Sequence, residues 1–227
     1  MNRFFVDTKV NDTFILDKET IKHLMVIRAK EKQFICVYQN EFYLCVLDDN
    51  NNAQIIQKLE ENHELNNEVI LALSVIKLDR FEWALQKATE LGVSKIIPML
   101  TQYTQHDLVK FNKFSAKYDR FNTILKNAAE QSFRNKIPEL LPLTKFEDVI
   151  QMQCAAKFIA HEKIATSIPL PQPIQSDVLF LVGPEGGFSQ DEILLAQQNG
   201  VEAISLGSRI LRAETAAIYL LSQIKIQ

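Results

Sequence analysis

From residue 69 to the C-terminus, short apolar runs alternate with amphipathic stretches, and this alternation leaves few folds open to the chain. Continuous apolar runs predict buried strands at residues 69–74, 96–100, 157–160, 178–182 and 203–206. Helical periodicity covers residues 80–91, where Gly92 marks the predicted end of the helix, and residues 114–133. Strands that alternate with helices predict an α/β fold with a parallel sheet.

Residues 1–68 have a different pattern, which is rich in short strands. Residues 33–38 and 42–47 flank a polar turn and predict a β-hairpin, and residues 53–59 predict a further strand. A short helical stretch covers residues 20–27. Several short strands with one small helix predict a compact barrel, and the polar stretch that follows them predicts a linker.

Two of the predicted strands lead into loops that carry glycine and charge. The first loop, residues 183–187, reads GPEGG, and the second, residues 206–216, reads LGSRILRAETA. Glycine permits positive φ and lets the backbone approach a ligand closely. If the two strands are parallel neighbours, the loops lie side by side at the edge of the sheet where small ligands bind. The pattern therefore predicts a ligand-binding enzyme, with ordinary strand–turn–helix connections as the alternative.

The first loop lacks both glycine-rich nucleotide fingerprints, the dinucleotide one and the P-loop. Glu185 also argues against a pyrophosphate ligand, because a carboxylate repels phosphate. A ligand with a cationic or neutral face suits the loop better. Directly after it, Ser189 and Glu192 have the spacing of a capping box, which predicts the start of a helix.

The second loop gathers the charged residues Arg209, Arg212 and Glu214. One interpretation is a surface turn in which these charges are solvated and Arg212 forms a weak ion pair with Glu214. An almost continuous apolar helix follows at once, however, and it must be buried. Charges at the mouth of a buried helix favour a cleft, and we therefore predict that these residues belong to a functional site.

Seven blocks of the chain, in order from end to end, resemble the RsmE family of 16S ribosomal RNA uridine-N3 methyltransferases, which belongs to the SPOUT class. They are residues 3–6, 23–28, 87–93, 128–134, 161–162, 181–189 and 206–216. The resemblance implies a PUA-like RNA-binding β-barrel over residues 1–68 and a SPOUT methyltransferase domain with a C-terminal trefoil knot over residues 69–227. The chain departs from the family pattern at Glu31-Lys32, at Leu78 and at residues 101–105, all on the implied RNA side.

The resemblance also implies S-adenosylmethionine as the methyl donor and N3 of a uridine in 16S ribosomal RNA as the acceptor. The cofactor residues that it implies are His161, Glu162, Gly183, Glu185, Gly186, Leu206, Gly207, Ile210, Leu211, Ala213 and Thr215. For His161 alone, a structural role is the alternative. The implied catalytic residues are Arg212, Arg209 and Glu214. One of the two arginines would hold the developing uracil anion, and Glu214 would orient that arginine. Alternatives are another substrate on the same scaffold and a ribosomal RNA-binding protein without catalysis.

The formal net charge of −3 argues against an RNA partner, because cationic contacts with phosphate supply most of the affinity of RNA-binding proteins. Positive charge nevertheless clusters in two segments, near the N-terminus and between residues 108 and 136, which suggests localised RNA contact. A solvated face is the alternative. The predicted RNA-binding residues are Arg3, Arg28, Lys30, Lys110, Lys113 and Arg134.

Other sequence features concern the compartment, metal binding and assembly of the protein. No apolar run is long enough to span a membrane, and Cys36, Cys45 and Cys154 have no metal-ligand spacing. We therefore expect a cytoplasmic protein with reduced thiols and no metal. Residues 213–226 are apolar around most of a helix, so we expect one face to be shared with another chain, with Leu220 and Leu221 among the covered residues. The resemblance implies that this other chain is a second copy, in a homodimer.

Overall fold

The computed structural model describes residues 1–27, 32–162 and 168–224. Contacts divide the chain into two compact units. The first comprises residues 1–64 together with 126–136, and the second comprises residues 65–125 together with 137–227. The predicted division between residues 68 and 69 remains a prediction. A boundary drawn from the linear sequence could not anticipate that residues 126–136 pack with the N-terminal unit.

The N-terminal unit is built on a six-stranded sheet in the order β1-β4-β5-β6-β3-β2. Its strands are β1 (Arg3–Phe5), β2 (Thr8–Val10), β3 (Thr13–Ile15), β4 (Phe34–Tyr38), β5 (Glu41–Leu47) and β6 (Ala53–Leu59). Helix α1 (Lys18–Val26) begins at Asp17, whose carboxylate accepts the Thr20 amide at 2.6 Å. The predicted hairpin is confirmed as β4–β5, which turns through Gln39 and Asn40 at φ 51° and 66°.

The second unit contains a parallel sheet in the order β10-β8-β7-β13-β11-β14-β12, with β9 also paired to β8. Its strands are β7 (Val69–Ser74), β8 (Lys95–Leu100), β9 (Glu139–Leu140), β10 (Thr144–Lys145), β11 (Ala156–Ala160), β12 (Ile168–Pro169), β13 (Val178–Val182) and β14 (Glu202–Ser205). The predicted α/β fold with a parallel sheet is confirmed.

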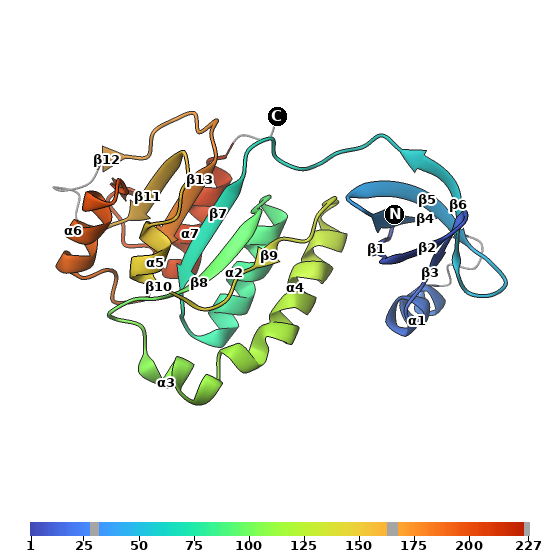
Figure 1. Cartoon of the computed structure of the whole chain (residues 1–227), viewed down its shortest axis with the longest axis horizontal. Helices are drawn as coiled ribbons and strands as arrows, with labels where there is room; N and C mark the ends of the chain where they lie inside the picture. Colours follow the sequence, from blue (N-terminus) through green and yellow to red (C-terminus); the bar gives the residue numbers. More distant parts are fainter. Residues whose placement is uncertain (28–31, 163–167, 225–227) are drawn as a thin grey trace. The chain divides into compact units, whose positions relative to one another are not determined.

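Helices cover both faces of this sheet (Figure 1). Every residue of β7 and β13 is buried, and alternate residues belong to two different hydrophobic clusters. One cluster includes α2 (Leu78–Glu90), the first half of α4 (Tyr118–Gln131) and α7 (Ala213–Ser222), and the other includes α5 (Phe146–Ile150) and α6 (Gln190–Gln198). Burial on both faces explains why these strands are continuous apolar runs rather than alternating ones.

Helix α2 ends as the sequence predicts, since Gly92 follows it at φ +88°. The predicted helix over residues 114–133 is largely confirmed as α4, but its first turn is the 3-10 helix η3 (Ser115–Lys117) rather than α-helix. Two further short helices, α3 (His106–Val109) and η2 (Lys110–Asn112), lie before the predicted start. Positive φ at Phe111 and Asn112 interrupts the helical path before residue 114.

The predicted capping box is confirmed at the start of α6. Ser189 Oγ accepts the Glu192 amide at 3.2 Å, and a carboxylate oxygen of Glu192 accepts the Ser189 amide at 2.8 Å. The second carboxylate oxygen of Glu192 accepts the amide of Gln102 at 2.8 Å. Glu192 therefore ties the segment after β8 to the start of α6.

Glu192→Ala should lower the free energy of unfolding by about 2–4 kcal/mol, because it leaves two backbone amides without their acceptor at a buried site. Denaturant unfolding measures this change. Asp191→Ala removes an exposed carboxylate one residue earlier and should cost under about 1 kcal/mol. Equal losses in the two variants would show that Glu192 acts only through its charge.

Among the described residues, no helix is long and apolar enough to cross a membrane.

A candidate active site at the ends of three parallel strands

A cavity of about 520 Å³ lies at the carboxyl ends of β11, β13 and β14, and we call it the main cavity. Its walls include residues 161–162, 183–190 and 206–207. The sheet order places β11 between β13 and β14, so the two glycine loops do not follow neighbouring strands, contrary to the sequence-based premise. Both loops still line one cavity because the segment after β11 lies between them. The volume is within the range of roughly 300–1,000 Å³ that ligand pockets occupy.

The first glycine loop is tightly packed against two aromatic residues. A Cβ added at Gly183 would lie 3.1 Å from ring carbons of Phe188, and one added at Gly186 would lie 3.1 Å from Cβ of Tyr103. Of these loop glycines, Gly187 has positive φ, at +69°. Close packing therefore favours glycine at 183 and 186, because a Cβ has little room there. Positive φ, which the sequence allows at Gly183, Gly186 and Gly187, occurs at Gly187.

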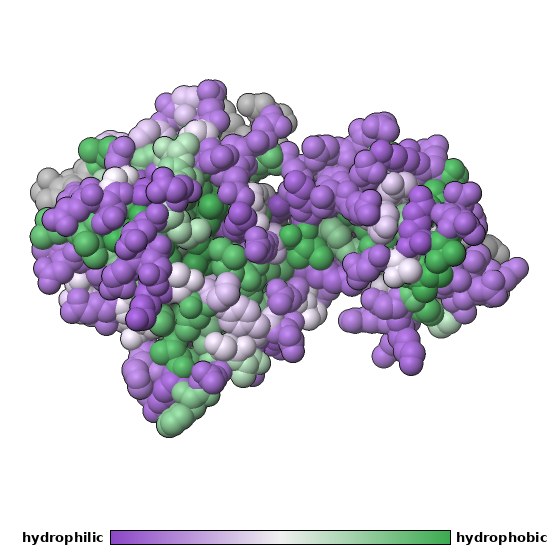
Figure 2. Space-filling model, in the orientation of Figure 1, coloured by the Kyte–Doolittle hydropathy of each residue, from purple (hydrophilic) through white to green (hydrophobic). Residues whose placement is uncertain are grey.

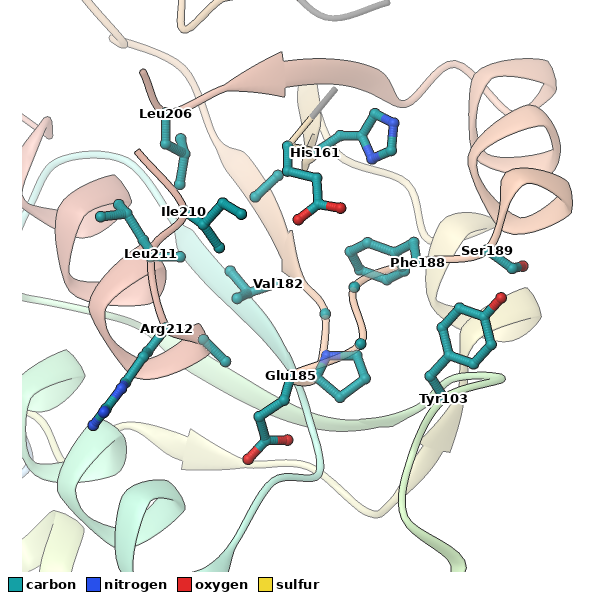
Figure 3. Close-up of a pocket in the computed structure, with 18 of the residues that line it drawn as sticks. Tyr103, His161, Val182, Glu185, Phe188, Ser189, Leu206, Ile210, Leu211 and Arg212 are labelled. Carbon is teal, nitrogen blue, oxygen red and sulfur yellow. The ribbon is translucent and has the colours of Figure 1, made fainter. Parts of the chain in front are cut away.

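The second glycine loop supplies most of the apolar wall. Leu206, Ile210 and Leu211 lie opposite Phe188, with Val182 between them (Figure 3). Ile210 is 82% exposed although it lines the cavity, so its side chain covers little protein surface. Gly207 turns the chain at φ +106° directly after the strand. An apolar wall beside exposed loop backbone suits a flat ligand with polar edges.

The segment after β11 forms the wall between the two loops. The backbone amide of His161 donates to the carbonyl of Ile204 at 2.9 Å, which extends the pairing of β11 with β14. His161 is buried, whereas Glu162 is exposed at the cavity. The sequence prediction that these two residues form a third wall is consistent with this arrangement.

Arg80, from the first turn of α2, contacts carboxylates of both loop regions. Its Nη1 donates to Glu185 Oε1 at 3.1 Å, and its Nε lies 4.0 Å from Glu214 Oε1. Glu214 is buried in the first turn of α7, so Arg80 provides much of the charge that compensates it. The arginine that Glu214 approaches is thus Arg80, whereas the predicted partner was Arg212 or Arg209.

Arg209 and Arg212 both line the main cavity and are exposed. Arg212 precedes α7, and its side chain extends away from the apolar wall of Ile210 and Leu211 (Figure 3). A guanidinium in this position can contact a second substrate that enters beside the cavity rather than the ligand deep inside it.

Most of the predicted site residues meet at the main cavity. The predicted residues that line it are His161, Glu162, Gly183, Glu185, Gly186, Leu206, Gly207, Arg209, Ile210, Leu211, Arg212 and Ala213. Thr215 and Glu214 are not among the lining residues: Thr215 is exposed on α7, and Glu214 is buried in the first turn of the same helix.

Tyr103, Phe188 and Arg80 also lie at the site and were not predicted from the sequence. A signal existed for Arg80, since it is the first arginine after β7 and the carboxyl end of every parallel strand is a candidate position for functional residues. Tyr103 had no such signal, because its position depends on hydrogen bonds that hold the loop after β8. Thr101 and Thr104 bond to Ser74 Oγ at 2.9 and 3.1 Å, and Gln102 bonds to Glu192.

Two of the predicted RNA-binding arginines already have protein partners in the N-terminal unit. Arg134 is 4% exposed and forms a two-pronged ion pair with Glu64, with Nε–Oε1 and Nη2–Oε2 distances of 3.0 and 2.5 Å. Arg3 donates to the carbonyl of Glu130 at 2.7 Å and lies 3.4 Å above the Phe133 ring. Burial lowers the pKa of the Arg3 guanidinium. These contacts support structural roles, and RNA binding by either residue remains a prediction.

Two of the other predicted RNA-binding residues, Lys110 and Lys113, lie on the segment between β8 and α4. Lys113 is exposed, and Lys110 is partly exposed and pairs with Asp107 at 2.5 Å. Arg28 and Lys30 lie outside the described residues. In the described part of the chain, no group of three or more histidine, cysteine, aspartate or glutamate side chains has a metal-binding arrangement.

Comparison with known proteins identifies the family. The family model of the RNA methyltransferase domain matches residues 63–225. The ribosomal RNA small subunit methyltransferase E of Mesomycoplasma hyopneumoniae (strain 232) is 41% identical over 226 residues, which are 98% of either chain. The chain belongs to the methyltransferase E family. A methyltransferase E of Bacillus subtilis (strain 168) is 34% identical over 252 residues, covering 100% of this chain and 97% of the relative.

Solved structures of methyltransferases have the same fold as this methyltransferase E chain. Methyltransferase E from Neisseria gonorrhoeae, bound to S-adenosyl methionine, has a TM-score of 0.86 at 25% identity over 98% of this chain and 95% of that one. A putative methyltransferase from Legionella pneumophila, in complex with the same cofactor, has a TM-score of 0.85 at 31% identity over 97% and 95%. The family that the sequence blocks predicted is confirmed.

Proposed function

We propose that this methyltransferase E uses S-adenosylmethionine to methylate N3 of a uridine in 16S ribosomal RNA of the small subunit. The observation that carries the proposal is the meeting of both glycine loops and the segment after β11 at one cavity. The relatives named above are ribosomal RNA small subunit methyltransferases, and two solved structures with this fold hold the cofactor.

The residues of the main cavity fit the chemistry of S-adenosylmethionine. Its apolar wall suits an adenine ring, and exposed loop backbone offers hydrogen bonds to the edge of that ring. The carboxylate of Glu162 suits a cationic ligand, whereas that of Glu185 is already paired with Arg80. We assign cofactor binding to His161, Glu162, Gly183, Glu185, Gly186, Leu206, Gly207, Ile210, Leu211 and Ala213, all of which line the cavity. The resemblance adds Thr215, which does not line it.

The bound cofactor would supply an electrophilic methyl group. The chain must then hold a uracil against it and stabilise the negative charge that develops on the base when the N3 proton leaves. Arg212 and Arg209 are the cations that line the cavity and remain exposed to an incoming base. Arg80 holds Glu185 and Glu214, so it keeps these carboxylates from neutralising the two catalytic arginines.

The finer features of the resemblance complete the proposal. The six-stranded sheet of the N-terminal unit is a PUA-like RNA-binding barrel, and the segment that carries the second loop and α7 forms a trefoil knot. RNA phosphates contact the basic segment with Lys110 and Lys113, together with Arg28 and Lys30 and the surface near Arg3 and Arg134. The protein acts in the cytoplasm, where ribosomal subunits are its substrate.

A homodimer is also part of the proposal, but its interface differs from the one expected from the sequence, which included Leu220 and Leu221. Leu220 and Leu221 are 0% and 1% exposed within a single chain, so they do not need a partner to cover them. The stripe of α7 that remains accessible contains Ile218, Tyr219 and Ser222, at helical spacing. Tyr219 is 41% exposed, and Ile210 of the preceding loop is 82% exposed. We place the two-fold contact on this stripe.

Tyr219→Asp should convert a dimer of about twice 26.0 kDa into a monomer, because it puts an unpaired charge into the proposed contact. Light scattering at low micromolar concentration measures the mass. Leu194→Asp changes an apolar residue that is 48% exposed on α6 and should leave the dimer intact. A wild-type protein that is monomeric and fully active would refute the dimer.

Transfer of labelled methyl from S-adenosylmethionine to purified 16S ribosomal RNA and to small subunits tests the function. The proposal requires label in 3-methyluridine. Label in another nucleoside would keep the enzyme class and change the acceptor atom. Cofactor binding without transfer to any ribosomal RNA would favour a binding protein without catalysis.

A further inference from the structure

The segment between β8 and α4 presents an aromatic side chain to solvent. Phe111, in the short turn η2, is 88% exposed, and it has the highest exposed fraction among the large apolar residues of the described chain. Figure 2 shows hydrophobic and hydrophilic residues side by side over the region that contains α3. An isolated exposed apolar residue is ordinary on a protein surface. The backbone around Phe111, however, holds it there.

Phe111 and Asn112 both adopt positive φ, at 53° and 57°. Asparagine tolerates this region, but phenylalanine rarely occupies it. The conformation is maintained because the segment is anchored on both sides. Leu108 and Val109 pack against the core before it, and Phe114 after it is fully buried, with ring centroids 5.0 Å from Phe81 and 5.1 Å from Phe121. Anchored flanks and a left-handed turn direct the Phe111 ring outward.

Lysine residues precede and follow Phe111 in the chain. Lys110, Lys113 and Lys117 lie within six residues of it, and residues 108–118 contain no acidic residue. Lys110 Nζ lies 6.0 Å from the centroid of the Phe111 ring and also pairs with Asp107. Lys113 and Lys117 are exposed, and Lys117 is near enough to Glu82 to help lower the pKa of that carboxyl. An exposed flat ring with lysines before and after it in the chain has the chemistry of a site for a base and its phosphates.

We propose that Phe111 is a stacking platform for an unpaired base of the RNA substrate, and that Lys110 and Lys113 contact the phosphates beside that base. Proteins recognise single-stranded RNA in this way, with aromatic rings under the bases and cations along the backbone. The platform rests on the proposed function, which supplies the RNA. It positions RNA outside the main cavity and takes no part in the chemistry.

The segment that carries Phe111 is continuous in the chain with the wall of the main cavity. Tyr103 lines that cavity, and the chain continues from it through α3 to Phe111 eight residues later. The hydroxyls of Thr101 and Thr104 hold the first residues of this route to Ser74 at the end of β7. RNA held at Phe111 is therefore bound to a segment whose other end is part of the cavity wall.

Phe111→Ala should raise the KM for the RNA substrate at least about fivefold, the lower end of what one stacked base contributes, and should leave kcat and cofactor affinity unchanged. Phe111→Trp should retain wild-type KM, because it keeps a flat ring. Phe111→Leu should resemble Phe111→Ala. Leu194→Ala, which removes exposed apolar surface on α6, is the matched control. An unchanged KM in Phe111→Ala, or a wild-type KM in Phe111→Leu, would overturn the proposal.

A fluorescence measurement separates this proposal from the proposed function. The single tryptophan, Trp83, is first replaced by phenylalanine, and Phe111→Trp then places the only tryptophan at the platform. An unstructured oligoribonucleotide should quench its emission, and added salt should reverse the quenching. This readout does not need methyl transfer, so a protein that fails to methylate ribosomal RNA can still stack a base.

Two outcomes of the fluorescence measurement would contradict a base platform. One is no quenching by RNA at concentrations where the protein binds it. The other is a blue shift with anionic phosphatidylglycerol vesicles in place of a response to RNA, which would identify a membrane surface as the partner.

Discussion

Gly186→Val should abolish S-adenosylmethionine binding and methyl transfer while the protein stays folded. A Cβ at this position would already lie 3.1 Å from Cβ of Tyr103, and valine adds two methyl groups beyond it. The loop or Tyr103 must then move, and both line the main cavity. Calorimetry with the cofactor measures binding, and thermal unfolding reports the fold.

Gly186→Ala serves as the graded control for this variant. It adds the Cβ alone, so the loop needs to shift by only a few tenths of an ångström, and cofactor binding should weaken less than in Gly186→Val. Wild-type cofactor affinity in a folded Gly186→Val protein would remove the first glycine loop from the binding site.

Arg212→Ala should lower kcat for methyl transfer by about 10²–10³-fold, the usual cost of removing one group that stabilises negative charge in a transition state. Cofactor affinity should stay near the wild-type value, because Arg212 is exposed and extends away from the apolar wall of the cavity (Figure 3). Initial-rate assays with saturating RNA and cofactor measure kcat. Arg212→Lys should recover only part of the loss, since an ammonium lacks the planar guanidinium fork.

Arg209→Ala is the matched comparison, because Arg209 is an exposed arginine of the same loop that also lines the cavity. A loss confined to the Arg212 variants would assign the anion-stabilising role to Arg212. Wild-type turnover in Arg212→Ala would show that Arg212 has no catalytic role, and an equal loss in both variants would assign the role to the loop as a whole.

The strands and their class were predictable from the sequence because burial on both faces leaves a strong signal. Residues 69–74 and 178–182 are continuous apolar runs, and both form central strands with the predicted bounds. The capping box at Ser189 and the helix end at Gly92 were predictable for a similar reason, since each depends on local hydrogen bonds or φ.

The order of the strands in the sheet, and the contacts at the site that follow from it, were not predictable from the sequence. The sequence gives no indication that β11 lies between β13 and β14, because parallel strands can be joined by crossovers of any span. Tyr103 was not predictable either, because its contact with Gly186 joins segments about 80 residues apart. Arg80 did have a signal in its place after β7, but its contact with Glu185, 105 residues away, did not. The buried positions of Leu220 and Leu221 were also hidden, since an apolar helix in a chain looks the same whether its own sheet or a partner covers it.

Mass spectrometry of small-subunit RNA from cells with and without the gene tests the central claim most directly. The account predicts that one 3-methyluridine is lost without the gene and that it returns with the wild-type gene. The Gly186→Val gene should not restore it, whereas Leu194→Ala should. An unchanged content of 3-methyluridine in the small-subunit RNA of cells without the gene would contradict the account.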